Sequence, residues 1–151
     1  MENPREKIID AIKHLLIICN DGKEGYRNAS EDVEAEELKS IFNRYSIQRA
    51  GFAVEIKTIL RNLGEDVDNL EGGPMGTLHR TWMDVKSALS GKDNGAILSA
   101  CVTGEKVALE AYDDLLEDSN IEWGSKNILI MQREEIADAL MTIQNLEKQY
   151  A

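Results

Sequence analysis

The longest regular pattern of apolar and polar positions runs from Glu36 to Leu63. Within it, core-type residues recur at alternating steps of four and three, the spacing of one face of a long α-helix. The positions on this face are Leu38, Phe42, Tyr45, Arg49, Phe52, Ile56, Ile59 and Leu63. Arg49 is the exception, because a charge on a core-facing stripe needs a buried partner.

A similar alternation predicts a helix over residues 4–30, with Asn3 as its N-cap. Gly22 and Gly25 each cost about 1 kcal/mol relative to Ala within a helix and could divide it into two pieces. Tyr26 remains in phase with the earlier apolar residues, however. The pattern therefore favours one continuous helix.

Two more long helices are expected over residues 93–117 and 125–150, with Asp93 and Ser125 as their N-caps. Each carries apolar residues along one face and a polar residue near the middle of it. These polar residues are Glu105 and Gln132.

The connections decide how the four helices are arranged. Residues 31–35 are few and acidic, so the first two helices must form an antiparallel hairpin. Residues 64–92 contain a polar, glycine-rich stretch and a shorter amphipathic helix at 76–89, enough to cross the length of a bundle. We expect a single all-α domain over residues 1–151. It is a ferritin-like four-helix bundle in which a long crossover with a short extra helix joins two antiparallel hairpins.

Counting inward from the helix ends places Arg49 and Glu105 in neighbouring layers near the bundle centre. An unpaired buried charge costs several kcal/mol, so we expect an ion pair, with a tyrosine hydroxyl or Gln132 taking the remaining hydrogen-bonding positions. The pair either fixes the helix register or lines a ligand or metal pocket. The predicted central polar network is Arg49, Glu105, Tyr45, Tyr112 and Gln132.

Charge and composition limit the classes of partner that can be expected to bind this chain. The formal net charge of −11 would repel nucleic acid and anionic membranes, so neither is expected to bind. No apolar run is long enough to span a bilayer, and the start MENPREK lacks the apolar core of a signal peptide, which predicts a cytoplasmic protein. Cys19 and Cys101 fall on apolar faces and are expected as buried, reduced thiols.

The residues also resemble a known family. The run LSACVTGEKVALEAYDDLL at 98–116 is similar to the third helix of rubrerythrin-type ferritin-like proteins, and ELKSIFNRYSIQRAGF is similar to their second helix. Over nearly its full length, the chain resembles an uncharacterised bacterial ferritin-like family, a domain of unknown function. The elements DGxEGY, RxxF, HRxW and GE that carry this resemblance lie at Asp21–Tyr26, Arg49–Phe52, His79–Trp82 and Gly104–Glu105.

The departures from the di-iron members of that superfamily concern the metal ligands. Their second helix carries a Glu and, three residues later, a His, where this chain has Arg49 and Phe52. The resemblance therefore implies that a central Arg/Glu network has replaced the ancestral metal site, in a non-enzymatic structural or interaction protein that is stress-associated and homo-oligomeric. No cofactor is expected on this interpretation.

Two alternatives remain open. One is an iron or manganese carboxylate site, with or without oxidoreductase activity, whose ligands would be Glu55, Glu105, Glu135 and Asp138. The other is a small-molecule binder in which an anion contacts Arg49. No GxSxG, P-loop or HExxH motif is present to indicate a specific enzyme. His79, Arg80 and Trp82 are a candidate protein-binding surface, although Trp82 is more simply explained as a core residue.

Overall fold

The computed structural model describes residues 3–68 and 76–150, without the side chains of 76–81. All regular secondary structure within those ranges is helical, which confirms the all-α prediction. The helices are α1 (Pro4–Asp32), α2 (Glu36–Asn62), α3 (Gly76–Gly91), α4 (Asn94–Leu116) and α5 (Trp123–Gln149). None of them has the length and apolar character that a bilayer crossing requires.

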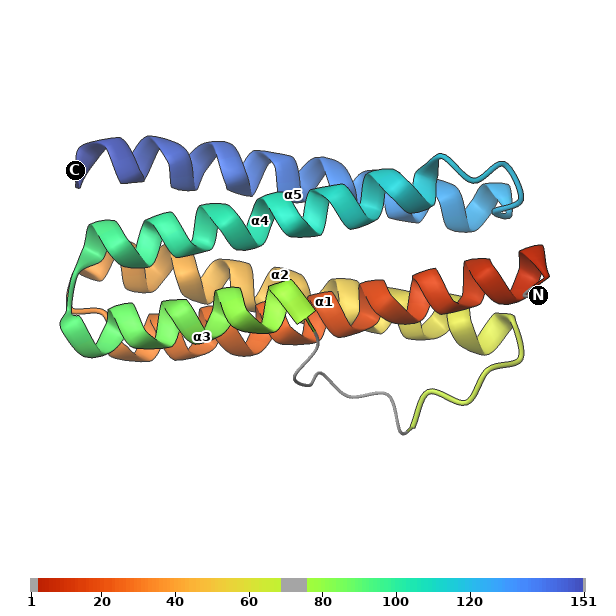
Figure 1. Cartoon of the computed structure of the whole chain (residues 1–151), viewed down its shortest axis with the longest axis horizontal. Helices are drawn as coiled ribbons and strands as arrows, with labels where there is room; N and C mark the ends of the chain where they lie inside the picture. The colour runs from red at the N-terminus through yellow and green to blue at the C-terminus, as the bar shows by residue number, and fades with distance from the viewer. Residues whose placement is uncertain (1–2, 69–75, 151) are drawn as a thin grey trace.

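The four long helices form two antiparallel hairpins that lie alongside each other (Figure 1). One hairpin is α1 with α2, the other is α4 with α5, and α2 and α4 begin at the same end of the bundle. The shorter α3 packs against α1 and α4 and returns the chain to the end where α2 began. Residues 69–75 of the predicted crossover lie outside the described part of the chain.

The α1 helix continues through both of its internal glycines, as predicted. Each glycine makes room for a large side chain from another helix. A Cβ atom at Gly22 would lie 3.5 Å from the Arg49 side chain, whereas one at Gly25 would lie only 2.1 Å from the Trp82 ring. Tertiary packing on the bare backbone thus offsets the low helix propensity of glycine here.

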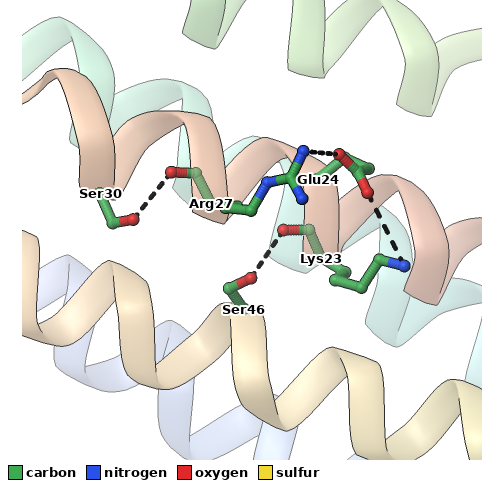
Figure 2. A network of polar contacts seen from close by, with 5 residues as sticks. All are labelled: Lys23, Glu24, Arg27, Ser30 and Ser46. Atoms are coloured by element: carbon green, nitrogen blue, oxygen red, sulfur yellow. Dashed lines mark hydrogen bonds and ion pairs between the residues drawn. The ribbon is translucent and has the colours of Figure 1, made fainter.

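Polar contacts also involve this part of α1 (Figure 2). The Ser46 hydroxyl of α2 donates a 2.9 Å hydrogen bond to the Lys23 carbonyl oxygen, between the two glycines. Along α1, Arg27 contacts Glu24 at 2.9 Å, and Ser30 donates to the Arg27 carbonyl oxygen at 2.7 Å. The contact from Ser46 ties the middle of α2 to the middle of α1, beside the predicted polar centre.

Two of the three predicted N-caps are confirmed. The side chains of Asn3 and Asp93 each accept a hydrogen bond from the backbone N–H three residues later. The prediction of Ser125 as the N-cap of the last helix is wrong. This helix, α5, begins two residues earlier, and Glu122 occupies the cap position without a side-chain hydrogen bond. Ile121, which is buried against the core, brings the chain to the bundle directly before this start.

The core consists of two apolar clusters, one toward each end of the bundle. The positions predicted on the core-facing stripe of α2 point into these clusters, with Leu63 only partly buried. Trp82 of α3 packs against both clusters. The buried polar or charged side chains of the described residues are Ser46, Arg49, Glu105 and Gln132.

Candidate functional site

Arg49 of α2 and Glu105 of α4 form an ion pair at the bundle centre. Arg49 Nη1 donates to Glu105 Oε1 at 2.7 Å, and Arg49 Nη2 donates to Glu105 Oε2 at 2.5 Å. The two residues are 2 % and 1 % exposed. This bidentate geometry satisfies both carboxylate oxygens and cancels the charge, which a deeply buried pair requires. The predicted pairing of these two residues is therefore present.

The remaining surroundings of the guanidinium come from α1 and α2. Arg49 Nε donates to the Gln48 side-chain oxygen at 3.1 Å, and the guanidinium carbon lies 5.6 Å from the centre of the Tyr26 ring. That distance is within the range of a cation–π contact. Gly22 leaves the space that the Arg49 side chain occupies. Arg49 is thus enclosed by residues of both helices of the first hairpin.

The positive charge of Arg49 is fixed. Burial alone would lower the pKa of Arg49, but the adjacent Glu105 carboxylate more than offsets this and raises the pKa above its ordinary value. Burial, and then the negative charge of Glu105, raise the pKa of the Tyr26 hydroxyl and of the Cys101 thiol. Both groups keep their protons at neutral pH.

A second buried network lies next to the pair. Gln132 Nε2 of α5 donates to the Phe52 carbonyl oxygen at 3.4 Å and to Glu55 Oε1 at 3.2 Å. Its Oε1 accepts from the Tyr112 hydroxyl at 2.6 Å, and that hydroxyl lies 3.4 Å from Cys19 Sγ.

The direction of these hydrogen bonds follows from the acceptors. A carbonyl and a carboxylate can only accept, so the Gln132 amide nitrogen must face Phe52 and Glu55. Tyr112 must then donate to the Gln132 oxygen, which leaves the Cys19 thiol as the donor to Tyr112. The result is a continuous hydrogen-bonded chain from a buried thiol to the exposed Glu55. We call these residues, Cys19, Tyr112, Gln132 and Glu55, the thiol chain.

Burial raises the pKa of Cys19 to about 11, which keeps this thiol protonated and unreactive at neutral pH. Cys19 and Cys101 are both fully buried and neither forms a disulfide, as expected from the sequence.

None of Tyr45, Tyr112 and Gln132 hydrogen-bonds to the Arg49 guanidinium in the described interactions. Tyr112 and Gln132 hydrogen-bond to each other and not to the guanidinium, because Glu105 and Gln48 already accept from it. Tyr45 packs its ring against the Tyr26 ring, with the centroids 5.5 Å apart. The predicted single network is therefore two adjacent ones.

Tyr26, Gly22 and Cys19 were missed as members of the centre. All three lie on the buried stripe of α1. Counting helical layers along α1, as along α2 and α4, brings these residues level with Arg49. The alternating spacing gives the height of these residues along α1. Their residue types, however, do not indicate a polar neighbour, because glycine and aromatic residues also occur on purely apolar stripes.

The alternative metal ligands are not brought together. Glu105 is buried and paired with Arg49, whereas Glu55, Glu135 and Asp138 are exposed. Among the residues that the structure describes, no three His, Cys, Asp or Glu side chains gather in a way that could hold a metal ion. The reason is that the α5 acids lie outside the buried stripe of their helix.

Surface hollows lie away from the pair. Three of them have volumes of about 380 to 390 Å³, and none of the three is lined by Arg49 or Glu105. His14 lies at the rim of the hollow between α1 and α4. The side chains of His79 and Arg80 lie outside the described part of the structure, and Trp82 is partly buried with its ring edge-on to Tyr26.

Comparison with known proteins gives a family. No curated protein matches the sequence. A family model described as a domain of unknown function (DUF2383) matches residues 7–118, which include most of α1, all of α2 and α3, and α4. This range holds both members of the ion pair and every thiol-chain residue except Gln132. The chain belongs to the DUF2383 family.

Proposed function

We propose that this chain is a non-enzymatic, ferritin-like bundle with a structural or protein-interaction role, in which the Arg49–Glu105 pair takes the place of a di-iron centre. The observation that carries the proposal is the bidentate pair itself. Both oxygens of Glu105, the one buried carboxylate among the described residues, accept hydrogen bonds from Arg49. A carboxylate whose two oxygens are both engaged, and whose charge is already neutralised by a guanidinium, is a poor ligand for a metal ion.

The helix arrangement supports the ferritin-like part of the proposal. Two antiparallel hairpins joined by a long crossover, with α2 and α4 beginning at the same end, are the connectivity of ferritin-like folds (Figure 1). In such folds metal ligands project from all four helices into the centre. Here the corresponding space is filled by Arg49, by Tyr26 and by the thiol chain.

The test is metal analysis of protein purified without chelator and then incubated with Fe²⁺ or Mn²⁺ before desalting. We expect far less than one metal ion per chain, and no change in thermal unfolding when EDTA is added. Stoichiometric iron or manganese would contradict the proposal and favour the metal-carboxylate alternative.

A matched pair of variants locates any metal that does bind. Glu105→Gln removes the buried carboxylate, whereas Glu134→Gln removes an exposed carboxylate of α5. Binding that is lost only in Glu105→Gln would place the metal at the centre and overturn the proposal. Binding that is equally weak in both variants and in the parent chain would reflect surface acids and leave the proposal standing.

A further inference from the structure

The short helix α3 packs against both α1 and α4, but it follows only part of their length. In Figure 1 it runs along the part nearest the start of α4 and leaves the other part uncovered. Its Trp82 ring packs on Gly25 of α1, and α3 runs in the same direction as α1. The start of α3 therefore lies level with about residue 19 of α1, and about 22 Å of α1 extends beyond it.

A groove lies between α1 and α4 in this uncovered part. Its volume is about 390 Å³, and its floor consists of apolar side chains from both helices. These floor residues are Ile8, Ala11, Val107, Ala111 and Leu115. We call the floor and the charged residues at its edges, described below, the α1/α4 groove.

The α1/α4 groove continues the surface that α3 covers. Gly25, which packs on α3, comes 14 residues after Ala11. Ile97, which lines a hollow together with Leu89 of α3, comes 14 residues before Ala111. Positions 14 residues apart lie on the same face of an α-helix, to within about 40°. In the groove, α1 and α4 thus present to solvent the same faces that hold a helix farther along the bundle.

The two edges of the groove differ in charge. Glu110, Asp114 and Asp118 line it from α4. They follow steps of four residues, which sets them about 6 Å apart along the helix axis. None of the three takes part in an ion pair within the described part of the chain. The edge on α1 carries Lys7 and His14 instead. Negative charge is therefore concentrated along the α4 edge.

We propose that the α1/α4 groove binds an amphipathic helix of a partner protein, with apolar residues on the floor and lysine or arginine at every fourth position beside α4. Both helices rise about 6 Å in four residues, so each basic side chain of the partner would meet one carboxylate. The open length accommodates about 15 helical residues. A second copy of this chain is disfavoured, because its formal net charge of −11 would be repelled by the acidic edge.

The inference rests on the protein-interaction role proposed above, for which it supplies a surface and a class of partner. The two can fail separately, because the groove does not include Arg49 or Glu105. If a metal-free chain fails the binding tests below, the replacement of the di-iron centre stands and only the docking site is lost.

Fluorescence anisotropy with labelled synthetic peptides tests the proposal. The probe is a helical peptide of about 15 residues, with Leu and Ala on one face and Lys at every fourth position along one edge. A second peptide has Glu in place of each Lys. The parent chain should bind the lysine peptide at least about tenfold more tightly than the glutamate peptide at physiological salt. Absence of binding to the lysine peptide, or equal binding of both peptides, would overturn the proposal.

A matched pair of variants separates the groove from overall charge. Asp114→Lys and Glu134→Lys change the charge of the chain equally, but Asp114 lines the groove whereas Glu134 is exposed on α5. Asp114→Lys should weaken binding of the lysine peptide by about tenfold, and Glu134→Lys by less than about twofold. Equal weakening would show that the peptide responds only to net charge, which the proposal does not allow.

A single reactive thiol locates the bound peptide. The two native cysteines of the chain are buried, so His14→Cys introduces its one exposed thiol. The lysine peptide should slow maleimide labelling of His14→Cys and leave Thr142→Cys, an exposed position on α5, unchanged. An unchanged labelling rate at residue 14 would contradict the proposed location. Protection of His14→Cys that increases with protein concentration, without peptide, would show that a second copy occupies the groove and would contradict a basic partner.

Discussion

The Arg49–Glu105 pair and the thiol chain lie side by side in the bundle and both connect its helices, but burial acts on them differently. The pair holds two full charges, each of which depends on the other for neutralisation. The thiol chain holds mostly neutral groups, each of which contributes one ordinary hydrogen bond. Substituting one residue of the pair should therefore cause a large loss of stability. Substituting one residue of the thiol chain should cause only the small loss that one hydrogen bond contributes.

The largest effect is expected from Arg49→Met. This substitution keeps most of the side-chain volume but leaves the Glu105 carboxylate buried without its partner. The free energy of unfolding, measured by urea denaturation, should fall by about 3 to 5 kcal/mol.

The double variant Arg49→Met with Glu105→Leu separates charge from packing. It removes both charges, so it should recover much of the stability lost in the single variant. A double variant as unstable as the sum of the two single variants would show that the residues are not energetically coupled.

Stability should depend on pH in the alkaline range, and Cys19 of the thiol chain should contribute to this dependence. The Cys19 thiol has an ordinary pKa of 9.0 and a pKa of about 11 when folded. The folded chain thus retains a proton that the unfolded chain releases. Its contribution is fully present below about pH 9 and is lost as the pH rises through 11, an effect of about 2 to 3 kcal/mol.

The measurement is urea unfolding at intervals between pH 8 and pH 11. Burial raises the pKa values of Cys101, Tyr26 and Tyr112 as well, so they add a slope of the same sign. The informative quantity is therefore the difference in slope between the parent chain and Cys19→Ala. Parallel slopes in the two proteins would contradict the assignment to Cys19.

The two glycines of α1 offer a sharper comparison of the space around the centre. A methyl group at Gly25 would clash with the Trp82 ring, so Gly25→Ala should cost about 1 to 3 kcal/mol. A methyl group at Gly22 would make ordinary contact with Arg49, and Gly22→Ala should be neutral or stabilise by up to about 1 kcal/mol. Thermal unfolding of both variants checks this, and a Gly25→Ala variant as stable as Gly22→Ala would contradict the predicted clash with Trp82.

The course of the chain was largely predictable because helical periodicity and short connections restrict it strongly. The stripes of α1, α2, α4 and α5 and the Arg49–Glu105 pair followed from spacing and from the cost of an orphaned charge. The division of the centre into two networks did not follow, because it depends on rotations of a few tens of degrees about each helix axis. The start of α5 was missed because no capping side chain marks it: Glu122 occupies the cap position without a side-chain hydrogen bond.

The smallest effect should come from the thiol chain, and it completes the comparison with the pair. Tyr112→Phe removes the hydroxyl that donates to Gln132 and accepts from Cys19, without opening a cavity. Gln132 keeps its contacts to Phe52 and Glu55, so the loss should be about 1 to 2 kcal/mol by urea denaturation. A loss as large as that of Arg49→Met would mean that the two networks act as one. In that case, the thiol chain would be part of what holds the charge pair in place.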